Sequence, residues 1–285
     1  MTQTLTLPAI APAEGSENFV VTDCSGYADF ADSNVPADKR KIDLEWCGDM
    51  GFKEGLKAMR DGDLAAVPAS DKLLGDLESL VPMSRAFRTV DSVVGSHPNI
   101  PAYLAGVPVA MRLRKRVASP SAPLAIMVEL VASAGVTADQ CRARGVAMLA
   151  LVRMLANIRP VELWAVIAIG ENRSRSSILI RLDTSPLDLA RAAHVLTHPN
   201  VFRGLGYRAI SQKFYDGNWG GHWGFNNADH HRKTARESYL RVIASGSDVL
   251  FIPPMHLSDR YLTAPVQWLK SMLATHGGIA MDGAA

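Results

Sequence analysis

LAIMVELV at residues 124–131 is followed by a helical pattern at 137–157 and by a second apolar run, VELWAVIAI, at 161–169. An apolar run of this length, broken only by Glu129, is typical of a strand buried on both faces of a sheet. The helix is expected to begin at Thr137, because Thr137 and Gln140 have the spacing of a capping box. A strand, a crossover helix and a second strand predict an α/β sheet with parallel neighbours.

The pattern continues on the carboxyl side. Residues 176–182 and 249–252 are further short apolar runs, and residues 186–197 and 264–274 have helical spacing. The close pair 161–169 and 176–182 predicts an antiparallel hairpin at one edge of the sheet. The expected fold class is therefore α/β, with a mixed, mostly parallel sheet flanked by helices.

This element order resembles the core of a von Willebrand factor A-type domain over residues 122–275. In that family a metal site begins with Asp-x-Ser-x-Ser directly after the first strand. Here the corresponding stretch runs Glu129-Leu-Val-Ala-Ser133 and has only one of the two serines. No metal ligation is therefore expected from this resemblance.

The rest of the chain divides by composition. We expect a mobile tail at 1–16, which is rich in Thr, Ala and Pro and has no period. Residues 17–117 are expected to form an acidic, helical N-terminal region with an irregular segment, and residues 118–285 the α/β core with a glycine-aromatic loop at about 202–241. Within the N-terminal region, the pattern predicts helices near 52–61 and 70–80 and a strand at 87–94.

Charge is unevenly distributed along the chain. Residues 14–78 hold 15 Asp and Glu against 7 Lys and Arg, whereas the remainder holds 23 basic against 13 acidic residues. A basic body suggests an anionic partner, and the alternative is two solvated faces of opposite sign. The acidic region is expected either to contact a protein partner or to compete with DNA for the basic surface.

Several classes of protein are disfavoured. The chain has no apolar run long enough to span a membrane and no secretory signal pattern. Its three cysteines are far apart, so neither a disulfide framework nor a thiolate zinc site is expected. Phosphate-loop, dinucleotide-binding, nucleophile-elbow and His-Glu-x-x-His motifs are absent, which disfavours those chemistries without excluding an enzyme.

The segment 202–241 is the most unusual in composition. It holds 8 of the 19 aromatic residues, with 7 basic against 3 acidic residues. Bases stack on aromatic rings while Lys and Arg follow phosphates, so this mixture is typical of a single-strand groove. The alternative is a structural flap whose aromatic residues belong to the core. A weaker alternative is a metal site at His222, Asp229 and His230, whose spacing matches no closed zinc pattern.

Two further basic clusters extend the candidate site. Residues 112–116 carry four cations in five positions, which fits either phosphate contact or a charged edge strand. Arg173, Arg175 and Arg181 lie on the predicted hairpin. The candidate nucleic-acid-binding residues are Arg112, Arg114, Lys115, Arg116, Arg173, Arg175, Arg203, Tyr207, Arg208, Trp219, Trp223, Arg232, Lys233 and Arg236.

Other segments carry a resemblance to a group of bacteriophage proteins. They are Trp46-x-Gly48, Asp91–Gly95 with Ile100–Pro108, Arg144-Gly145 and His198-Pro-Asn-Val-Phe-Arg203. In outline the chain is similar to the Drc-type early proteins of podophages. That resemblance implies single-stranded DNA binding, recruitment of a phage RNA polymerase, and a place in the host cytoplasm.

The sequence therefore predicts a phage single-stranded DNA-binding protein acting in transcription or replication, with no catalysis and no cofactor. Its expected partners are single-stranded DNA and a phage RNA polymerase or replication protein. No membrane partner is expected, and homo-oligomerisation is left open. The alternatives are a protein-binding adaptor with an A-type domain and, more weakly, a metal-dependent hydrolase.

Overall fold

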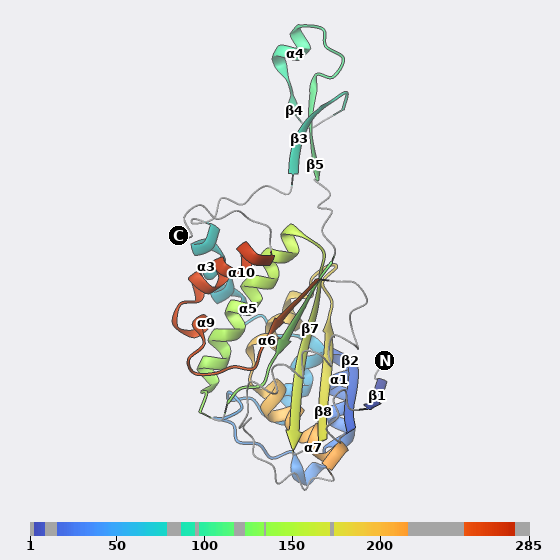
Figure 1. Cartoon of the computed structure of the whole chain (residues 1–285), viewed down its shortest axis with the longest axis vertical. Helices are drawn as coiled ribbons and strands as arrows, with labels where there is room; N and C mark the ends of the chain where they lie inside the picture. The colour runs from blue at the N-terminus through green and yellow to red at the C-terminus, as the bar shows by residue number, and fades with distance from the viewer. Residues whose placement is uncertain are drawn as a thin grey trace.

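A computed structural model describes residues 3–8, 16–78, 87–94, 97–116, 123–133, 135–171, 174–215 and 248–276. Its main feature is a six-stranded sheet of order β1-β2-β8-β7-β6-β9 (Figure 1). The strands are β1 (Gln3–Pro8), β2 (Ser16–Asp23), β6 (Leu124–Glu129), β7 (Val161–Glu171), β8 (Ser174–Leu182) and β9 (Asp248–Ile252). Three of the five pairings are parallel, namely β2 with β8, β7 with β6, and β6 with β9. The predicted mixed, mostly parallel α/β fold is confirmed.

The strands of the core are buried on both faces. In β6, Ile126 belongs to the cluster that contains the helices, whereas Met127 belongs to a second cluster made of strand residues alone. The same alternation separates Ala165 from Trp164 in β7. Successive side chains point to opposite faces, so near-continuous apolar runs are what a doubly buried sheet requires.

Helices pack on one face of this sheet (Figure 1). Helix α5 (Ala138–Ile158) begins at the predicted capping box of Thr137 and Gln140 and packs beside α6 (Leu189–Thr197). A buried π-helix, η2 (Val201–Gly206), leads into α7 (Tyr207–Tyr215). The short α9 (Arg260–Thr263) and α10 (Pro265–His276) end the described chain.

The N-terminal residues belong to the sheet, which corrects two predictions. The prediction of a mobile tail over residues 1–16 is wrong for Gln3–Pro8, because this strand, β1, pairs antiparallel with β2. The hairpin of β7 and β8 is confirmed, but it is not at an edge, because β2 adds in parallel to β8. A strand that precedes its neighbour by more than 150 residues leaves no local pattern in the sequence.

The acidic region packs onto this sheet rather than forming a separate unit. It contains α1 (Cys24–Asn34), η1 (Ala37–Lys39), α2 (Phe52–Asp61) and α3 (Val67–Glu78). Helix α1 is anchored by Tyr27, whose hydroxyl donates to the backbone carbonyl of Val201. Helix α3 packs on α5, where Leu77 is fully buried.

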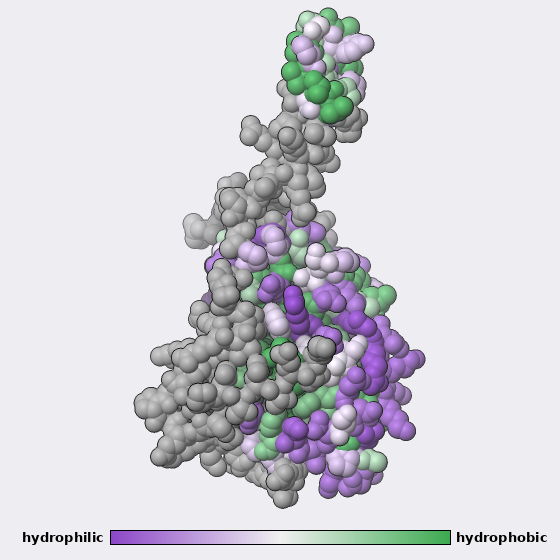
Figure 2. Space-filling model, turned by 90° about the vertical axis from the view of Figure 1, so that its right-hand side faces the viewer, coloured by the Kyte–Doolittle hydropathy of each residue, from purple (hydrophilic) through white to green (hydrophobic). Residues whose placement is uncertain are grey.

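A small three-stranded sheet projects from this body as an arm (Figure 1). Its order is β3-β5-β4, and the pairings are antiparallel. The arm consists of β3 (Phe87–Ser92), β4 (His97–Pro98), α4 (Ile100–Leu104) and β5 (Met111–Arg116). Figure 2 shows apolar residues at the far end of the arm.

Within the described ranges, no helix has the length and hydrophobicity needed to cross a membrane. All three cysteines are buried and unpaired. Burial raises the pKa of Cys24 to about 12 and that of Cys47 to about 11. These thiols are therefore protonated and unreactive at neutral pH.

Candidate functional site

The arm carries the most basic strand of the described chain. Strand β5 reads MRLRKR, and the three strands of the arm hold five cations against the single carboxylate of Asp91. Positions 112, 114 and 116 alternate along the strand and therefore share one face. Arg112 is exposed, opposite Asp91 on one side and His97 on the other.

The register also brings like charges together. Lys115 lies directly opposite Arg88 across the β3–β5 pairing. With five cations against one carboxylate in its three strands, the ribbon has the composition that suits a phosphate-bearing ligand.

Six of the fourteen candidate nucleic-acid-binding residues lie outside the described residues. This applies to the residues that follow α7 and to one arginine of the hairpin: Trp219, Trp223, Arg232, Lys233, Arg236 and Arg173. His222, Asp229 and His230, the alternative metal ligands, also lie there. Among the residues that the structure does describe, no three His, Cys, Asp or Glu side chains are grouped as a metal site would require.

Two predicted contact residues are in the interior. Arg203 is only 2% exposed, and its guanidinium donates to the carbonyls of Trp46 and Val136, at 3.0 and 2.6 Å. Tyr207 is buried beside it. The prediction that these two residues contact DNA is wrong, because η2 and the start of α7 pack against the N-terminal region instead of facing solvent.

The other described candidates do not extend the arm into one stripe. Arg208, at the start of α7, donates to the carbonyl of Lys39 at 2.9 Å. Arg175 is in β8, with Glu17 of β2 and Gly170 of β7 as its register neighbours. Helix α7 and the arm lie at opposite ends of the molecule (Figure 1). Among the candidates that the structure describes, β5 therefore brings four together in one strand of the arm.

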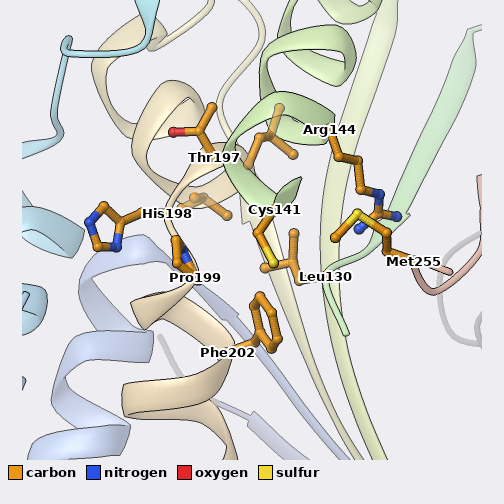
Figure 3. A pocket seen from close by; sticks show the side chains of 10 residues that line it. Leu130, Cys141, Arg144, Thr197, His198, Pro199, Phe202 and Met255 are labelled. Carbon is orange, nitrogen blue, oxygen red and sulfur yellow. The ribbon is translucent and has the colours of Figure 1, made fainter. Parts of the chain in front are cut away.

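A small cavity lies at the carboxyl ends of β6 and β9 (Figure 3). Crevices at this position of α/β sheets often bind ligands. Here Cys141, Leu130 and Phe202 face one another, while the guanidinium of Arg144 lies beside Met255. The space is about 10 Å³, enough for about one water molecule. Arg144 donates to the carbonyl of Pro253 at 2.7 Å, so this arginine ties α5 to the chain after β9.

Next to this cavity are two stacked histidines. The rings of His194 and His198 are 5.3 Å apart, and neither ring nitrogen of His194 has a hydrogen-bond partner among the described residues. Burial, together with the neighbouring His198, lowers the pKa of His194 to about 3. Burial and the charge of Arg142 lower the pKa of His198 to about 4. Both imidazoles are therefore neutral in the folded protein at pH 7.

This pair makes stability dependent on pH. In the unfolded chain a histidine binds a proton below about pH 6.5, whereas folded His194 stays neutral down to about pH 3. The free energy of unfolding is thus unaffected above pH 6.5 and falls below it, by about 1.4 kcal/mol per pH unit for His194. Between pH 7 and pH 5, the free energy of unfolding of His194→Leu should fall by about 2 kcal/mol less than that of the wild type. Urea unfolding at the two pH values measures the difference. Parallel pH curves for the two proteins would contradict this.

A family model matches residues 15–263, which is most of the chain. The chain belongs to the DUF7192 family. That family is described as a domain of unknown function, and no curated protein or solved structure matches the chain. The match runs from β2 to α9, so the DUF7192 domain includes the arm.

Two surface features of the DUF7192 chain escaped the sequence analysis. The first is a groove of about 350 Å³ beside α2, where Arg40, Lys53, Lys57 and Arg60 gather within the acidic region. Asp32 pairs with Arg40 and Asp29 with Arg60, at 2.8 Å each, so two of these four cations are already engaged in ion pairs. The second is the apolar end of the arm. Its signal was visible in the sequence, since residues 93–110 contain no Asp, Glu, Lys or Arg.

Proposed function

We propose that this protein binds single-stranded DNA without catalysis, and that strand β5 of the arm supplies phosphate contacts. The observation that carries the proposal is the gathering of five cations on a projecting ribbon with one carboxylate. A projecting, cationic ribbon can follow a nucleic-acid backbone, and release of counterions from the phosphates supplies affinity.

The glycine-aromatic loop remains part of the proposal. Trp219 and Trp223 would stack on bases, and Arg232, Lys233 and Arg236 would neutralise phosphates. The biological setting, a bacteriophage protein that acts with a phage polymerase in transcription or replication, comes from the resemblance of Trp46-x-Gly48 and the other quoted segments. It is proposed on that ground alone.

Replacing Arg112, Arg114, Lys115 and Arg116 together by alanine tests the role of the arm. Each lost phosphate contact should flatten the slope of log K against log salt by about 0.7, or about 2.8 for four contacts to a single strand. Fluorescence anisotropy with an oligonucleotide at several salt concentrations measures the slope. The matched control replaces Lys39, Lys41, Lys72 and Arg260, four exposed cations of the body. Equal slopes for the arm variant and the wild type would exclude β5 from the interface.

A further inference from the structure

The end of the arm is an exposed apolar surface. Ten large hydrophobic residues of the described chain are exposed, and seven of them lie between residues 93 and 109. In α4, Ile100, Tyr103 and Leu104 are 61%, 70% and 78% exposed and have the spacing of one helix face. The apolar tip consists of Val93, Val94, Ile100, Tyr103, Leu104, Val107 and Val109.

Cations follow directly behind this tip. Strand β5 starts at Met111, beside the tip, and its basic positions extend back toward the body over about 13 Å from Arg112 to Arg116. Figures 1 and 2 show the tip at the far end of the arm, away from the packed helices. The molecule therefore presents an uncharged apolar end and, next to it, a row of positive charge.

We infer that the apolar tip inserts into the interface of a bilayer containing anionic phospholipid, with the cations of β5 among the headgroups. A fluid bilayer accepts a convex apolar tip without needing a matching groove. Tyrosine is favoured at the membrane–water interface, where Tyr103 would lie. Basic residues near anionic lipid each strengthen binding by about fivefold. Insertion of this kind needs no membrane-spanning helix.

Other occupants fit the surface less well. Bases stack on aromatic rings, and Tyr103 is the one aromatic residue of the tip, so most of the aliphatic surface would stay exposed on DNA. Two tips packed against each other would bring together two arms that each carry a net charge of +4 in their strands. The inference goes beyond the proposed DNA binding and does not depend on it.

Vesicle sedimentation of the full chain tests the inference. The wild type should bind vesicles of phosphatidylcholine with phosphatidylglycerol, and should bind pure phosphatidylcholine far less. Leu104→Asp should weaken binding at least about tenfold, because the variant has no leucine side chain to transfer from water into the bilayer. Leu64→Asp, a control at a 56% exposed position of the body, should bind as the wild type does. Oligonucleotide affinity should be equal for all three proteins.

Three results would overturn the inference. The first is a wild type that does not bind the anionic vesicles, and the second is a Leu104→Asp variant that binds them normally. The third is loss of oligonucleotide binding or of self-association in Leu104→Asp, which would assign the tip to DNA or to a second copy. A dye on Val107→Cys gives an independent readout, since the native cysteines are buried. Its emission should shift to the blue on anionic vesicles, and an unchanged spectrum would count against insertion.

Discussion

Replacing Gly145 by alanine is expected to lower the free energy of unfolding by about 3 kcal/mol or more. Gly145 is the point where α5 crosses the end of α6. A Cβ atom there would lie 2.2 Å from the carbonyl oxygen of Leu196 and 2.4 Å from the Cα of Thr197. Both are backbone atoms of a buried segment, so a side-chain rotation cannot relieve the overlap. The two helices would have to move apart, and the core between them would lose its packing.

Gly75→Ala is the matched control. Gly75 lies in the helix α3, and a Cβ atom there would meet nothing within 4 Å. Alanine is the better helix former, so this change should raise the free energy of unfolding by up to about 1 kcal/mol. Urea unfolding of the two variants beside the wild type measures both effects. A Gly145→Ala protein as stable as the wild type would mean that the crossing is looser than the structure describes.

Gly145 belongs to a wider junction. Gly48 has a φ of +78°, and a Cβ atom there would lie 2.8 Å from Pro199. The side chain of Asn200 donates to the carbonyl of Met50 at 2.7 Å. The segments Trp46-x-Gly48, Arg144-Gly145 and His198–Arg203 therefore meet in one place. Because these three segments meet in the interior, they describe the packing of this fold rather than a ligand site, whereas another segment of the resemblance, Ile100–Pro108, lies in the arm.

Periodicity explains how much of the fold was predictable. The strands β6, β7, β8 and β9 and the helix α5 follow from apolar runs and a capping box, which are local signals. The position of β2 beside β8 is not local, since pairing over such a separation depends on which strand edge the rest of the fold leaves free. In the arm, the strand predicted at 87–94 is confirmed as β3, and 112–116 was considered as a charged edge strand. Their pairing into a small sheet was not predicted, because pairing partners leave no local signal in the sequence.

The candidate site was less predictable because composition does not distinguish an exposed cation from a buried one. Arg112 and Arg203 both lie in basic segments, yet the first is exposed and the second is buried. The two arginines differ in the residues next to them in the sequence and in the element that contains them. Arg203 is followed by Gly204-Leu205-Gly206 in a π-helix whose residues are all buried, whereas Arg112 lies in a strand that alternates charge on a projecting ribbon.

Arg203→Leu is accordingly expected to lower the free energy of unfolding by about 3 kcal/mol or more. The guanidinium satisfies the carbonyls of Trp46 and Val136 and lies 4.9 Å from the Trp46 ring. An apolar side chain would leave the buried carbonyl of Val136 without its donor, at about 1–3 kcal/mol, and would also remove the contact with the ring. Thermal or urea unfolding measures the loss.

The control for this prediction is Arg112→Leu, on the exposed face of the arm, where the same change should leave the free energy of unfolding within about 0.5 kcal/mol. The order of the two effects should be reversed for oligonucleotide affinity, which Arg112→Leu should lower more than Arg203→Leu. At a temperature where both are folded, Arg203→Leu should keep the oligonucleotide affinity of the wild type, and Arg112→Leu should lose one phosphate contact. A stable Arg203→Leu protein with weakened DNA binding would place this arginine at the interface after all, and would require η2 to open when DNA binds.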